Sequence, residues 1–529
     1  MFSILLFIKR HLLLSIFIAL LLLLIFLTYR DFGIPWDEKV FYNTGRYYTA
    51  KIFNRAGIPI YIDSQGFTPT DYHIKGHGVV YDIFVFILTL PWQNFTYENL
   101  HLLRALIAVL IFVVLYLIAR RFFSVQLAVF PLIILLLTPR FFPDMFYNAI
   151  DIPGALLFSL CIWLFISYIK SKPKLLNSVV LSLILAITIN HRLILSYIFL
   201  ANFLFFVIYN FKTKKMTWSY FLAINALLGV LTLFFLHLTH PVLLAKPVSG
   251  LVDLFVAVRQ YKWDSAVLFE GRFYQAGHPP LPLYYLPKTI LISLPPVTII
   301  LFLLGLAGLL AGIFRKKLKS FKDFLYLYLL FLSVVPFIIV FALRPTMYDS
   351  WRHFTFLLIP MSIFATYGMQ AILQLKYAAV KKILLILLTV GYISTAVAMI
   401  RLHPYEYIYY NFLVGGFKGA YDKYELDYWG LAYKETVDWF DKNINDGKRN
   451  YFIYVEGDPL SSSYYFSKNV QITPNVLHSN YIFAFTRWDI YKFHPGKTVH
   501  IIKKDGVPLV YIKLPGDYSK APNPFMLKD

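Results

Sequence analysis

The chain has 529 residues, of which 59% are hydrophobic and only 15% are charged, so it is far more apolar than a soluble globular protein. Its net charge of +22 would suit a nucleic-acid-binding protein, but the lysines and arginines gather in short clusters between apolar runs, as in the loops of membrane proteins. The single cysteine, Cys161, lies within an apolar run and excludes an internal disulfide. These features predict an α-helical polytopic membrane protein that binds no nucleic acid.

About eleven apolar runs are long enough to cross a membrane, which takes about 20 residues. They cover residues 12–28, 101–119, 122–138, 153–169, 175–190, 191–210, 217–239, 288–314, 323–343, 354–375 and 383–400. The first run ends without a small-residue cleavage site, so we interpret it as an uncleaved span and not as a signal peptide. The segment 175–210 is expected to hold two short spans with a hairpin at Asn190-His191-Arg192.

Short basic clusters predict the orientation of these spans. When the spans alternate from a cytoplasmic N-terminus, every cluster falls on the cytoplasmic side. The clusters are Lys9-Arg10, Arg120-Arg121, Lys170 with Lys172 and Lys174, Lys212 with Lys214 and Lys215, Arg315 with Lys316, Lys317 and Lys319, and Lys376 with Lys381 and Lys382. The short segment 79–92 carries Asp82 and would invert the later spans if it crossed, so we expect it to lie as a helix in the outer interface.

Two domains are predicted. Residues 1–400 would form the transmembrane domain, with a first outer loop at about 30–100 that contains interfacial helices. Residues 401–529 turn polar and would form a small extracytoplasmic α/β domain. Its predicted elements are a helix over 431–445, a strand over 451–455, and a hairpin that pairs 500–504 with 507–513 around Asp505-Gly506.

Acidic residues concentrate at predicted span ends in the first two outer loops. Asp37 and Glu38 follow the first span, and Asp144 and Asp151 lie in the second outer loop. Carboxylates are costly to place near lipid, which makes these residues a candidate active site, although a solvated loop end is the plainer alternative. Loops that leave neighbouring spans on one face can meet, so the four carboxylates can share one cavity. Asp151 also suits the N-cap of the following span, and that alternative stays open.

Basic residues accompany these acids on the predicted outer side. Lys75 and Arg352 can bind a phosphate through charge-assisted hydrogen bonds, with His353 beside them. Snorkelling of such side chains to lipid headgroups is the competing interpretation. The sequence contains no Gly-rich phosphate loop, no zinc signature and no nucleophile elbow, which argues against a soluble nucleotide-sugar or ATP site.

Several motifs resemble the GT-C integral membrane glycosyltransferases. They are Trp36-Asp37-Glu38 after the first span, Pro139-Arg140-Phe141-Phe142 with Tyr147-Asn148-Ala149-Ile150-Asp151-Ile152-Pro153 in the second outer loop, and Asp349-Ser350-Trp351-Arg352-His353-Phe354 before the tenth span. After the last span, Asp427-Tyr428-Trp429-Gly430-Leu431 is similar to bacterial members related to the protein O-mannosyltransferases and the lipid A aminoarabinose transferase. The resemblance touches most of the chain.

The resemblance implies the GT-C fold, a place in a bacterial inner membrane, and an inverting transfer on the extracytoplasmic face. The donor would be a hexose or pentose on a polyprenyl phosphate, and the acceptor a glycan, a lipid or a protein. The residues that it assigns to catalysis are Asp37 as the base, Glu38 as its partner, and Asp151 or Asp144 as a second-loop acid. Those that it assigns to the donor phosphate are Lys75, Arg352 and His353. No cofactor is predicted, and a divalent cation on the acids is left open.

The chemistry suits these residue types. An acceptor hydroxyl is a poor nucleophile, so a carboxylate within hydrogen-bond reach can take its proton. A leaving phosphate is already a stable anion, so nearby cations suffice where glycoside hydrolysis would need a second carboxylic acid. Two alternatives remain: a secondary transporter of a glycolipid or amphipathic solute, which should carry charges at mid-depth of its spans, and a non-catalytic membrane scaffold whose tail domain binds a partner.

Overall fold

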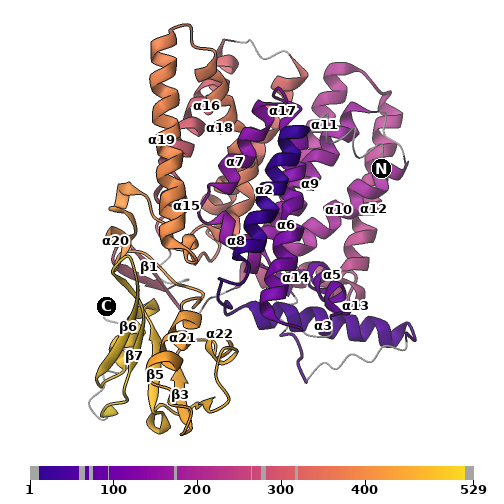
Figure 1. Ribbon diagram of the computed structural model, residues 1–529. Coiled ribbons are helices and arrows are strands. Elements are labelled where there is room, and N and C mark those ends of the chain that lie inside the picture. The colour runs from indigo at the N-terminus through magenta and orange to yellow at the C-terminus, as the bar shows by residue number, and fades with distance from the viewer. Residues whose placement is uncertain are drawn as a thin grey trace.

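The computed structural model describes most of the chain, namely residues 11–58, 66–70, 75–92, 95–171, 175–261, 263, 265–275, 281–315 and 320–518. Long helices form a bundle, and at one end of it lies the C-terminal region, which we define as residues 403–518 and which holds a β-sheet (Figure 1). Of the predicted basic clusters, Lys9-Arg10, Lys172, Lys174 and the three lysines at 316–319 lie outside the described residues.

Within the described residues, eight helices are long and apolar enough to cross a membrane. They are α6 (Tyr97–Ala119), α9 (Asp151–Lys170), the turn η2 (Leu193–Ser196) with α11 (Tyr197–Thr213), α12 (Trp218–Thr239), α16 (Pro296–Phe314), α17 (Phe321–Leu343), the turn η3 (Arg352–Leu357) with α18 (Leu358–Leu373), and α19 (Ala378–Leu402). Two further apolar helices, α2 (Leu12–Thr28) and α10 (Leu175–His191), have 17 residues each. With the bent pair described next, each predicted span coincides with apolar helix, and the chain is an integral membrane protein.

The third predicted span, residues 122–138, is shorter and more broken than expected. Its helical part consists of the turn η1 (Leu127–Val129) and α7 (Phe130–Leu136), and the next helix, α8 (Phe141–Tyr147), is bent from it by 70°. Pro139 explains the break, because proline disfavours a helical conformation in the preceding residue and has no N–H to donate. The bend brings the start of α8 against the C-terminal region, where Arg140 donates to the Tyr428 hydroxyl at 3.2 Å.

Two other breaks divide predicted helical runs. Residues 288–314 fall into α15 (Tyr285–Ser293) and α16, because Leu294 is extended ahead of two prolines, so the prediction of one continuous helix is wrong. The segment 175–210 contains two helices, as predicted, and they are separated at Arg192, whose backbone is extended. This break places the Arg192 side chain next to Asp151.

Basic helix ends gather at the end of the bundle that lies away from the C-terminal region (Figure 1). Arg121, just after α6, donates to the Ser167 hydroxyl near the end of α9 at 3.5 Å. Lys215, after α11, donates to the backbone carbonyl of Lys170 at 2.6 Å. These contacts bring three of the predicted basic clusters to one end of the bundle, as the alternation of spans requires.

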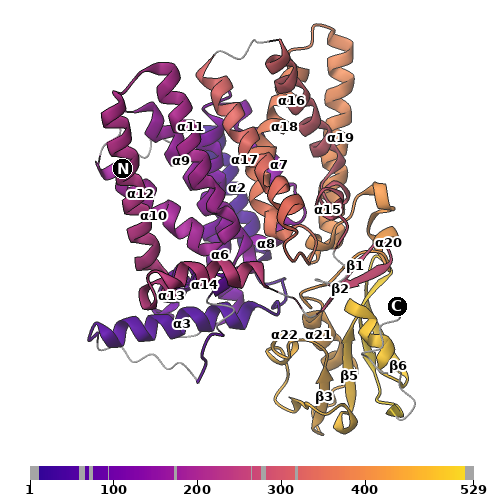
Figure 2. The same cartoon turned by 180° about the vertical axis from the view of Figure 1, so that it is seen from behind.

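Four helices too short or too polar to cross lie over the opposite end of the bundle, near the C-terminal region (Figure 2). They are α3 (Glu38–Arg55), α5 (Val80–Thr89), α13 (Pro241–Ala245) and α14 (Ser249–Arg259). The ten residues of α5 confirm the prediction of a short, non-spanning helix in 79–92. Gly45 lets α3 touch α5, because a Cβ there would lie 2.2 Å from the carbonyl oxygen of Asp82.

The C-terminal region contains a five-stranded mixed sheet with the strand order β4-β3-β5-β7-β6. The strands are β3 (Tyr451–Val455), β4 (Val470–Ile472), β5 (Tyr481–Phe485), β6 (Thr498–Lys504) and β7 (Val507–Lys513). β3 runs parallel to β4 and β5, whereas β7 runs antiparallel to β5 and β6. The predicted strand over 451–455 and the predicted hairpin are confirmed, and the predicted helix over 431–445 is α21 (Tyr433–Asn443).

A hairpin from the loop between α14 and α15 joins the C-terminal region to the bundle. Its strands are β1 (Ala266–Phe269) and β2 (Arg272–Gln275), and Phe269 forms an antiparallel bridge with Tyr424. The Trp488 indole N–H donates to the carbonyl of Ala266 at 2.7 Å. The short helices of the region are η4 (Glu406–Ile408), η5 (Phe412–Val414), α20 (Gly416–Ala420), α22 (Leu460–Ser463), η6 (Val476–His478) and η7 (Arg487–Phe493).

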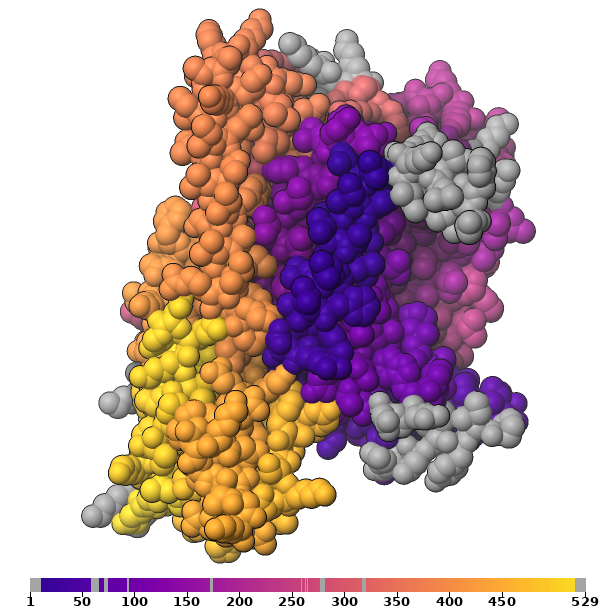
Figure 3. Space-filling model, in the orientation of Figure 1, coloured from indigo at the N-terminus to yellow at the C-terminus, as the bar shows by residue number. Residues whose placement is uncertain are grey.

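The first helix shows how the bundle meets lipid. α2, in indigo, runs along the outside of the bundle in Figure 3. Leu20 and Leu27 on its outer side are 62% and 68% exposed, while Leu21 and Ile25 are buried in the main core. A continuous exposed apolar face of this kind marks contact with a membrane.

Candidate active site

Asp37 opens toward solvent at the junction between α2 and α3. It directly precedes α3, and its side chain does not cap that helix. Its Oδ2 lies 3.8 Å from Nη1 of Arg352, and its side chain is 45% exposed, whereas the side chain of Arg352 is only 6% exposed. Asp37 can therefore be reached by a second molecule, yet it stands beside a buried positive charge.

The surroundings of Asp37 make it a better base than a free aspartate. Its partial removal from bulk water raises the pKa of Asp37, and the Arg352 guanidinium opposes that rise. The negative charges of Asp349 and Asp151 raise the pKa further. The net direction is upward, which strengthens the carboxylate as a proton acceptor while the cation keeps it accessible in its ionised form.

Arg352 lies at the centre of a group of carboxylates drawn from three loops. Its Nη2 is 3.1 Å from Oδ2 of Asp349, and its Nη1 is 3.8 Å from Asp37 and 3.9 Å from Asp151. The guanidinium also lies 5.1 Å from the ring centre of Trp429, within the range of a cation–π contact. A buried cation surrounded in this way fixes the relative positions of the acids that it joins.

Asn148 links the two acids of the second outer loop. Its Nδ2 donates to Oδ2 of Asp144 and to Oδ2 of Asp151, each at 3.0 Å. Asp151 begins α9 without capping it; its other oxygen pairs with Arg192, so the N-cap alternative is not what the structure adopts. Asp144 is buried, and its Oδ1 has no hydrogen-bond partner among the described residues. The first two outer loops therefore meet at Arg352, which lies beside both Asp37 and Asp151.

Glu38 faces away from this group. Its Oε1 lies 2.5 Å from Nη1 of Arg104 on α6, and both side chains are almost completely buried. Burial raises the pKa of Glu38 to about 7, although Arg104 opposes the rise. Glu38 therefore joins the start of α3 to α6, and it does not share the opening at Asp37.

Two residues of the C-terminal region enter the site, and the sequence interpretation missed both. Arg487 Nη2 lies 2.5 Å from Oδ1 of Asp349 and 3.4 Å from Oε1 of Glu425. Glu425 also accepts the backbone N–H of Asp349 at 3.2 Å. Neither residue lies in a recognisable motif; the available signal was an arginine directly after an apolar strand, in Tyr481-Ile-Phe-Ala-Phe-Thr-Arg487.

The Asp-Tyr-Trp-Gly block shapes the wall beside Asp37. Asp427 accepts the N–H groups of Leu431 and Ala432 at 2.9 Å each, so its role is to hold the turn. The turn leaves no room at Gly430, where a Cβ would lie 2.7 Å from Nε1 of Trp36. Trp36 is thereby wedged against the C-terminal region, next to the candidate base.

The other predicted phosphate ligands are less closely tied to this group. His353 is half-buried and packs edge-on against Tyr348, with ring centres 4.8 Å apart. Lys75 is half-buried and precedes α5 on the same end of the bundle. Their contact with a donor phosphate stays a prediction. In the described parts of the chain, no group of three or more His, Cys, Asp or Glu side chains is arranged to hold a metal ion.

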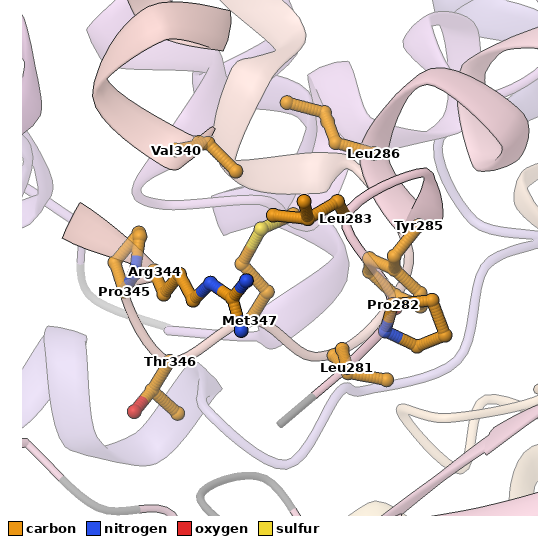
Figure 4. A pocket seen from close by; sticks show the side chains of 10 residues that line it. All are labelled: Leu281, Pro282, Leu283, Tyr285, Leu286, Val340, Arg344, Pro345, Thr346 and Met347. Atoms are coloured by element: carbon orange, nitrogen blue, oxygen red, sulfur yellow. The ribbon is translucent and has the colours of Figure 1, made fainter. Parts of the chain in front are cut away.

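A small cavity lies between the start of α15 and the segment that follows α17 (Figure 4). Its volume is about 80 Å³. It is lined by Leu281, Pro282, Leu283, Tyr285, Leu286, Val340, Arg344, Pro345, Thr346 and Met347. The Tyr285 hydroxyl connects it to the site by accepting the Ser350 N–H at 3.0 Å. Pockets that bury small ligands measure about 300–1,000 Å³, so this cavity is too small for a donor sugar and belongs to the packing behind the site.

Part of the chain matches one protein family, and the fold is similar to that of solved membrane proteins. Residues 84–240 match the family described as dolichyl-phosphate-mannose-protein mannosyltransferase. A comparison with curated protein sequences gave no significant match. Among solved structures, the chain is similar to ArnT from Cupriavidus metallidurans bound to undecaprenyl phosphate, with a TM-score of 0.50 and 12% sequence identity over 94% of this chain and 97% of that one.

A second similar structure is the archaeal oligosaccharyltransferase AglB from Archaeoglobus fulgidus in complex with an inhibitory peptide and a dolichol-phosphate. It aligns with a TM-score of 0.49 and 12% sequence identity over 90% of this chain and 70% of that one. The alignment with ArnT spans nearly the whole of both chains, so it shows that the two share one overall fold.

Proposed function

We propose, from the family match over residues 84–240 and the fold shared with ArnT, that this chain is a GT-C membrane glycosyltransferase that transfers a hexose or pentose from a polyprenyl phosphate to an acceptor glycan, lipid or protein. The matched family is named for a dolichyl-phosphate-mannose donor, and ArnT was solved with undecaprenyl phosphate bound. Both names support a sugar carried on an isoprenoid phosphate. The gathering of carboxylates at one end of the bundle favours this function over transport, for which charges at mid-depth would be expected.

The observation that carries the proposal is the accessible carboxylate of Asp37 beside the buried Arg352. The side chains of Asp151 and Asp349, which Arg352 also contacts, are only 1% and 3% exposed. Asp37 is thus the member of this group that an acceptor hydroxyl can approach. In the proposed step Asp37 takes the hydroxyl proton, the acceptor oxygen bonds to C1 of the sugar, and the bond from C1 to the phosphate oxygen breaks.

The departing phosphate needs positive charge and no proton donor, because it leaves as a stable anion. Lys75 and Arg352 are the proposed sources of that charge, and His353 is proposed to bind the phosphate through a ring N–H. Arg352 already lies beside three carboxylates, so its main proposed part is to keep Asp37 ionised and in place. Asp151 and Asp144 act through Arg352 and Asn148, and Glu38 supports the start of α3.

We place this site on the extracytoplasmic side of a bacterial inner membrane. The basic helix ends lie at the opposite end of the bundle, and such clusters remain in the cytoplasm. The N-terminus would then be cytoplasmic and the C-terminal region extracytoplasmic. The division into a transmembrane domain and a separate α/β domain near residue 400 belongs to the same proposal.

The first test measures transfer by the purified full-length chain. A panel of undecaprenyl-phosphate hexoses and pentoses is incubated with the protein and a cell-envelope extract as the acceptor source, and released undecaprenyl phosphate is quantified by mass spectrometry. Replacing Asp37 with Asn should slow release by about 10²–10⁴-fold. Asp31→Asn is the matched control, because Asp31 lies in the same loop with its side chain 47% exposed, and it should retain most of the rate.

Two results would overturn the proposal. If the unmodified chain releases no undecaprenyl phosphate from any donor of the panel, the transferase function is wrong. If Asp37→Asn releases it as fast as Asp31→Asn does, the base is another residue. The anomeric configuration of the product, read by NMR, adds an independent check: a single displacement inverts C1, and retention would point to a covalent intermediate.

The proposed contact of Lys75 with the donor phosphate is tested by measuring how tightly the protein binds undecaprenyl phosphate. Lys75→Ala should weaken the affinity for undecaprenyl phosphate by about 10–150-fold, the usual contribution of one charge-assisted hydrogen bond to phosphate. Binding is measured by native mass spectrometry of the detergent-solubilised protein. Lys51→Ala on the exposed side of α3 is the control, and equal affinities in the two variants would return Lys75 to a role at the lipid surface.

A further inference from the structure

Arg487 belongs to the C-terminal region by sequence but to the candidate active site by contact. It follows β5 and begins η7, where Trp488 and Asp489 both have left-handed backbone conformations, with φ of 57° and 56°. This tight turn folds the arginine back toward the bundle. Arg487 is 9% exposed and pairs with Asp349, 138 residues earlier in the chain.

The guanidinium of Arg487 is held on several sides. Nη2 contacts Asp349 at 2.5 Å and Glu425 at 3.4 Å, and Nη1 donates to the carbonyl of Tyr428 at 2.7 Å. Three indole rings surround it, with centres 4.6 Å away for Trp488, 4.9 Å for Trp263 and 5.6 Å for Trp36. A planar guanidinium clamped by acceptors and aromatic rings keeps one orientation, which an ammonium group could not do.

Asp349 transmits this contact to the rest of the site. Its Oδ1 faces Arg487, while its Oδ2 lies 3.1 Å from Nη2 of Arg352. Asp349 and Ser350 both have left-handed φ values, 54° and 65°, a conformation that costs about 1–2 kcal/mol in a residue other than glycine. The turn therefore needs the partners that hold it. One such partner is Glu425, which accepts the Asp349 N–H.

We propose that Arg487 is a positioning residue for sugar transfer: by holding Asp349, it orients the Arg352 guanidinium between Asp37 and Asp151. The inference rests on the proposed transferase function. Arg487 does not touch the candidate base; it acts on Asp37 through two intermediates. The C-terminal region then completes the active site, and its role goes beyond covering it.

A purely structural role for Arg487 would have a different signature. Other contacts also attach the C-terminal region to the bundle, such as the bond from the Tyr464 hydroxyl to Glu98 on α6 at 2.9 Å. If Arg487 merely adds to this attachment, its loss lowers the free energy of unfolding but leaves kcat unchanged. If it positions Arg352, its loss reduces turnover, and the loss depends on Asp349.

The experiment is a double-mutant cycle in the full-length chain, using the undecaprenyl-phosphate sugar that the unmodified protein turns over. The variants are Arg487→Gln, Asp349→Asn and the double substitution. The control is Arg449→Gln, because Arg449 lies in the same region over the ring of Tyr451 but is exposed. Turnover and KM are measured across pH, and thermal unfolding reports on folding.

We expect Arg487→Gln to lower kcat by about 10–100-fold, with KM changed by less than about 3-fold, since neighbouring residues of one network couple by such factors. The double variant should be no more than about 2-fold slower than Asp349→Asn alone, because Arg487 acts through Asp349. The acidic limb of the kcat/KM profile should move to higher pH in Arg487→Gln, since a positive charge near Asp37 is lost. Arg449→Gln should match the unmodified chain.

The outcomes separate the inference from the function on which it rests. If the kcat losses of the two single variants multiply in the double variant, Arg487 does not act through Asp349. If Arg487→Gln has a normal kcat and an unshifted acidic limb, Arg487 only attaches the C-terminal region. Either result would leave the transferase function intact. Absence of turnover by the unmodified chain with every donor would overturn the transferase function, and the inference with it.

Discussion

Asp37 and Glu38 are adjacent in the chain, but their side chains belong to two different groups of charged residues, which differ in exposure and in the number of partners. Asp37 has a side chain that is 45% exposed and stands 3.8 Å from an arginine that it shares with two other carboxylates. Glu38 is fully buried and has Arg104 at 2.5 Å. We call Asp37, Arg352, Asp151 and Asp349 the open group, and the buried pair of Glu38 and Arg104 the closed group. Accessibility decides the difference, because a base must meet its substrate, whereas an anchoring charge must avoid water.

The two groups also respond differently to substitution. The open group is a network in which Arg352 contacts acids from three loops. Replacing Arg352 therefore removes a positive charge from beside all three carboxylates. The closed group is a pair, in which a neutral form of Glu38 can still accept a hydrogen bond from Arg104. Four substitutions sharpen or break this comparison.

The largest effect is expected from Arg352→Ala. It removes one cation from each of the buried carboxylates of Asp151 and Asp349, which keep Arg192 and Arg487 as partners, and should lower the free energy of unfolding by about 2–4 kcal/mol and abolish transfer. Unfolding is followed by circular dichroism against temperature. The control, Arg401→Ala, removes an exposed arginine paired with Asp505 and should cost less than about 1 kcal/mol. The sequence alone assigned Arg352 to the donor phosphate, which predicts that Arg352→Ala mainly weakens donor binding. A variant that stays as stable as the unmodified chain and fails only to bind undecaprenyl phosphate would support that assignment and contradict the structural one.

The closed group predicts a pH dependence of stability. The pKa of Glu38 is about 7 in the folded chain and lies near 4.5 when the chain is unfolded, so the folded state holds the proton more tightly. Glu38 therefore makes its full contribution to the free energy of unfolding below pH 4.5. This contribution is lost as the pH rises through 7, by up to about 3 kcal/mol at 1.36 kcal/mol per pKa unit. In Arg104→Gln the pKa should rise further, because Arg104 holds it down, and the loss of stability should continue above pH 7. Melting temperatures from pH 4 to 9 that run parallel in the two proteins would contradict this.

The contact between Trp36 and the C-terminal region can be tested at glycine. Gly457 has φ of 86°, and a Cβ there would lie 2.4 Å from the ring of Trp36. Gly457→Ala should destabilise the chain by about 2–4 kcal/mol, from backbone strain and overpacking together, and should slow transfer several-fold by displacing the residue before Asp37. Gly447→Ala, at φ of 68° with nothing within 4 Å, pays the backbone strain alone. Equal melting temperatures and rates for the two variants would mean that Trp36 adjusts freely.

The smallest effect is expected from Glu38→Gln. The amide oxygen can still accept from Arg104, and the substituted side chain resembles the protonated glutamic acid, so stability at pH 5 should change by less than about 1 kcal/mol. Transfer should fall by less than about 10-fold, against the far larger loss in Asp37→Asn. Rates measured side by side for these two variants decide the matter: equally deep losses would place Glu38 in the chemistry.

The comparison also shows where sequence reasoning succeeded and where it stopped. Hydrophobic runs predicted the helices well, because a span is a local property of about 20 consecutive residues. Resemblance singled out the motif that contains Asp349 and Arg352, and in the structure Arg352 lies beside both Asp37 and Asp349. Arg487 and Glu425 escaped notice, because nothing in their neighbourhood along the chain marks them as partners of residues more than 60 positions away.

One break in the helices was missed, whereas the break at Arg192 was predicted. Pro295 stands inside the apolar run 288–314, so counting residues joined two helices that the backbone separates. The break near Pro139 turns α8, with Asp144, toward the C-terminal region. The break at Arg192 delivers an arginine to Asp151.

The sequence by itself therefore determined that this is a helical membrane protein, where its apolar helices lie along the chain, and which basic and acidic residues stand near their ends. Those properties depend on neighbours along the chain. Only the tertiary structure decided that Asp37 is open while Glu38 is closed, that one arginine joins three carboxylates, and that the C-terminal region supplies Arg487. Such contacts join residues that are far apart in the chain, and they form only when bent helices and strained turns bring them within a few ångströms of one another.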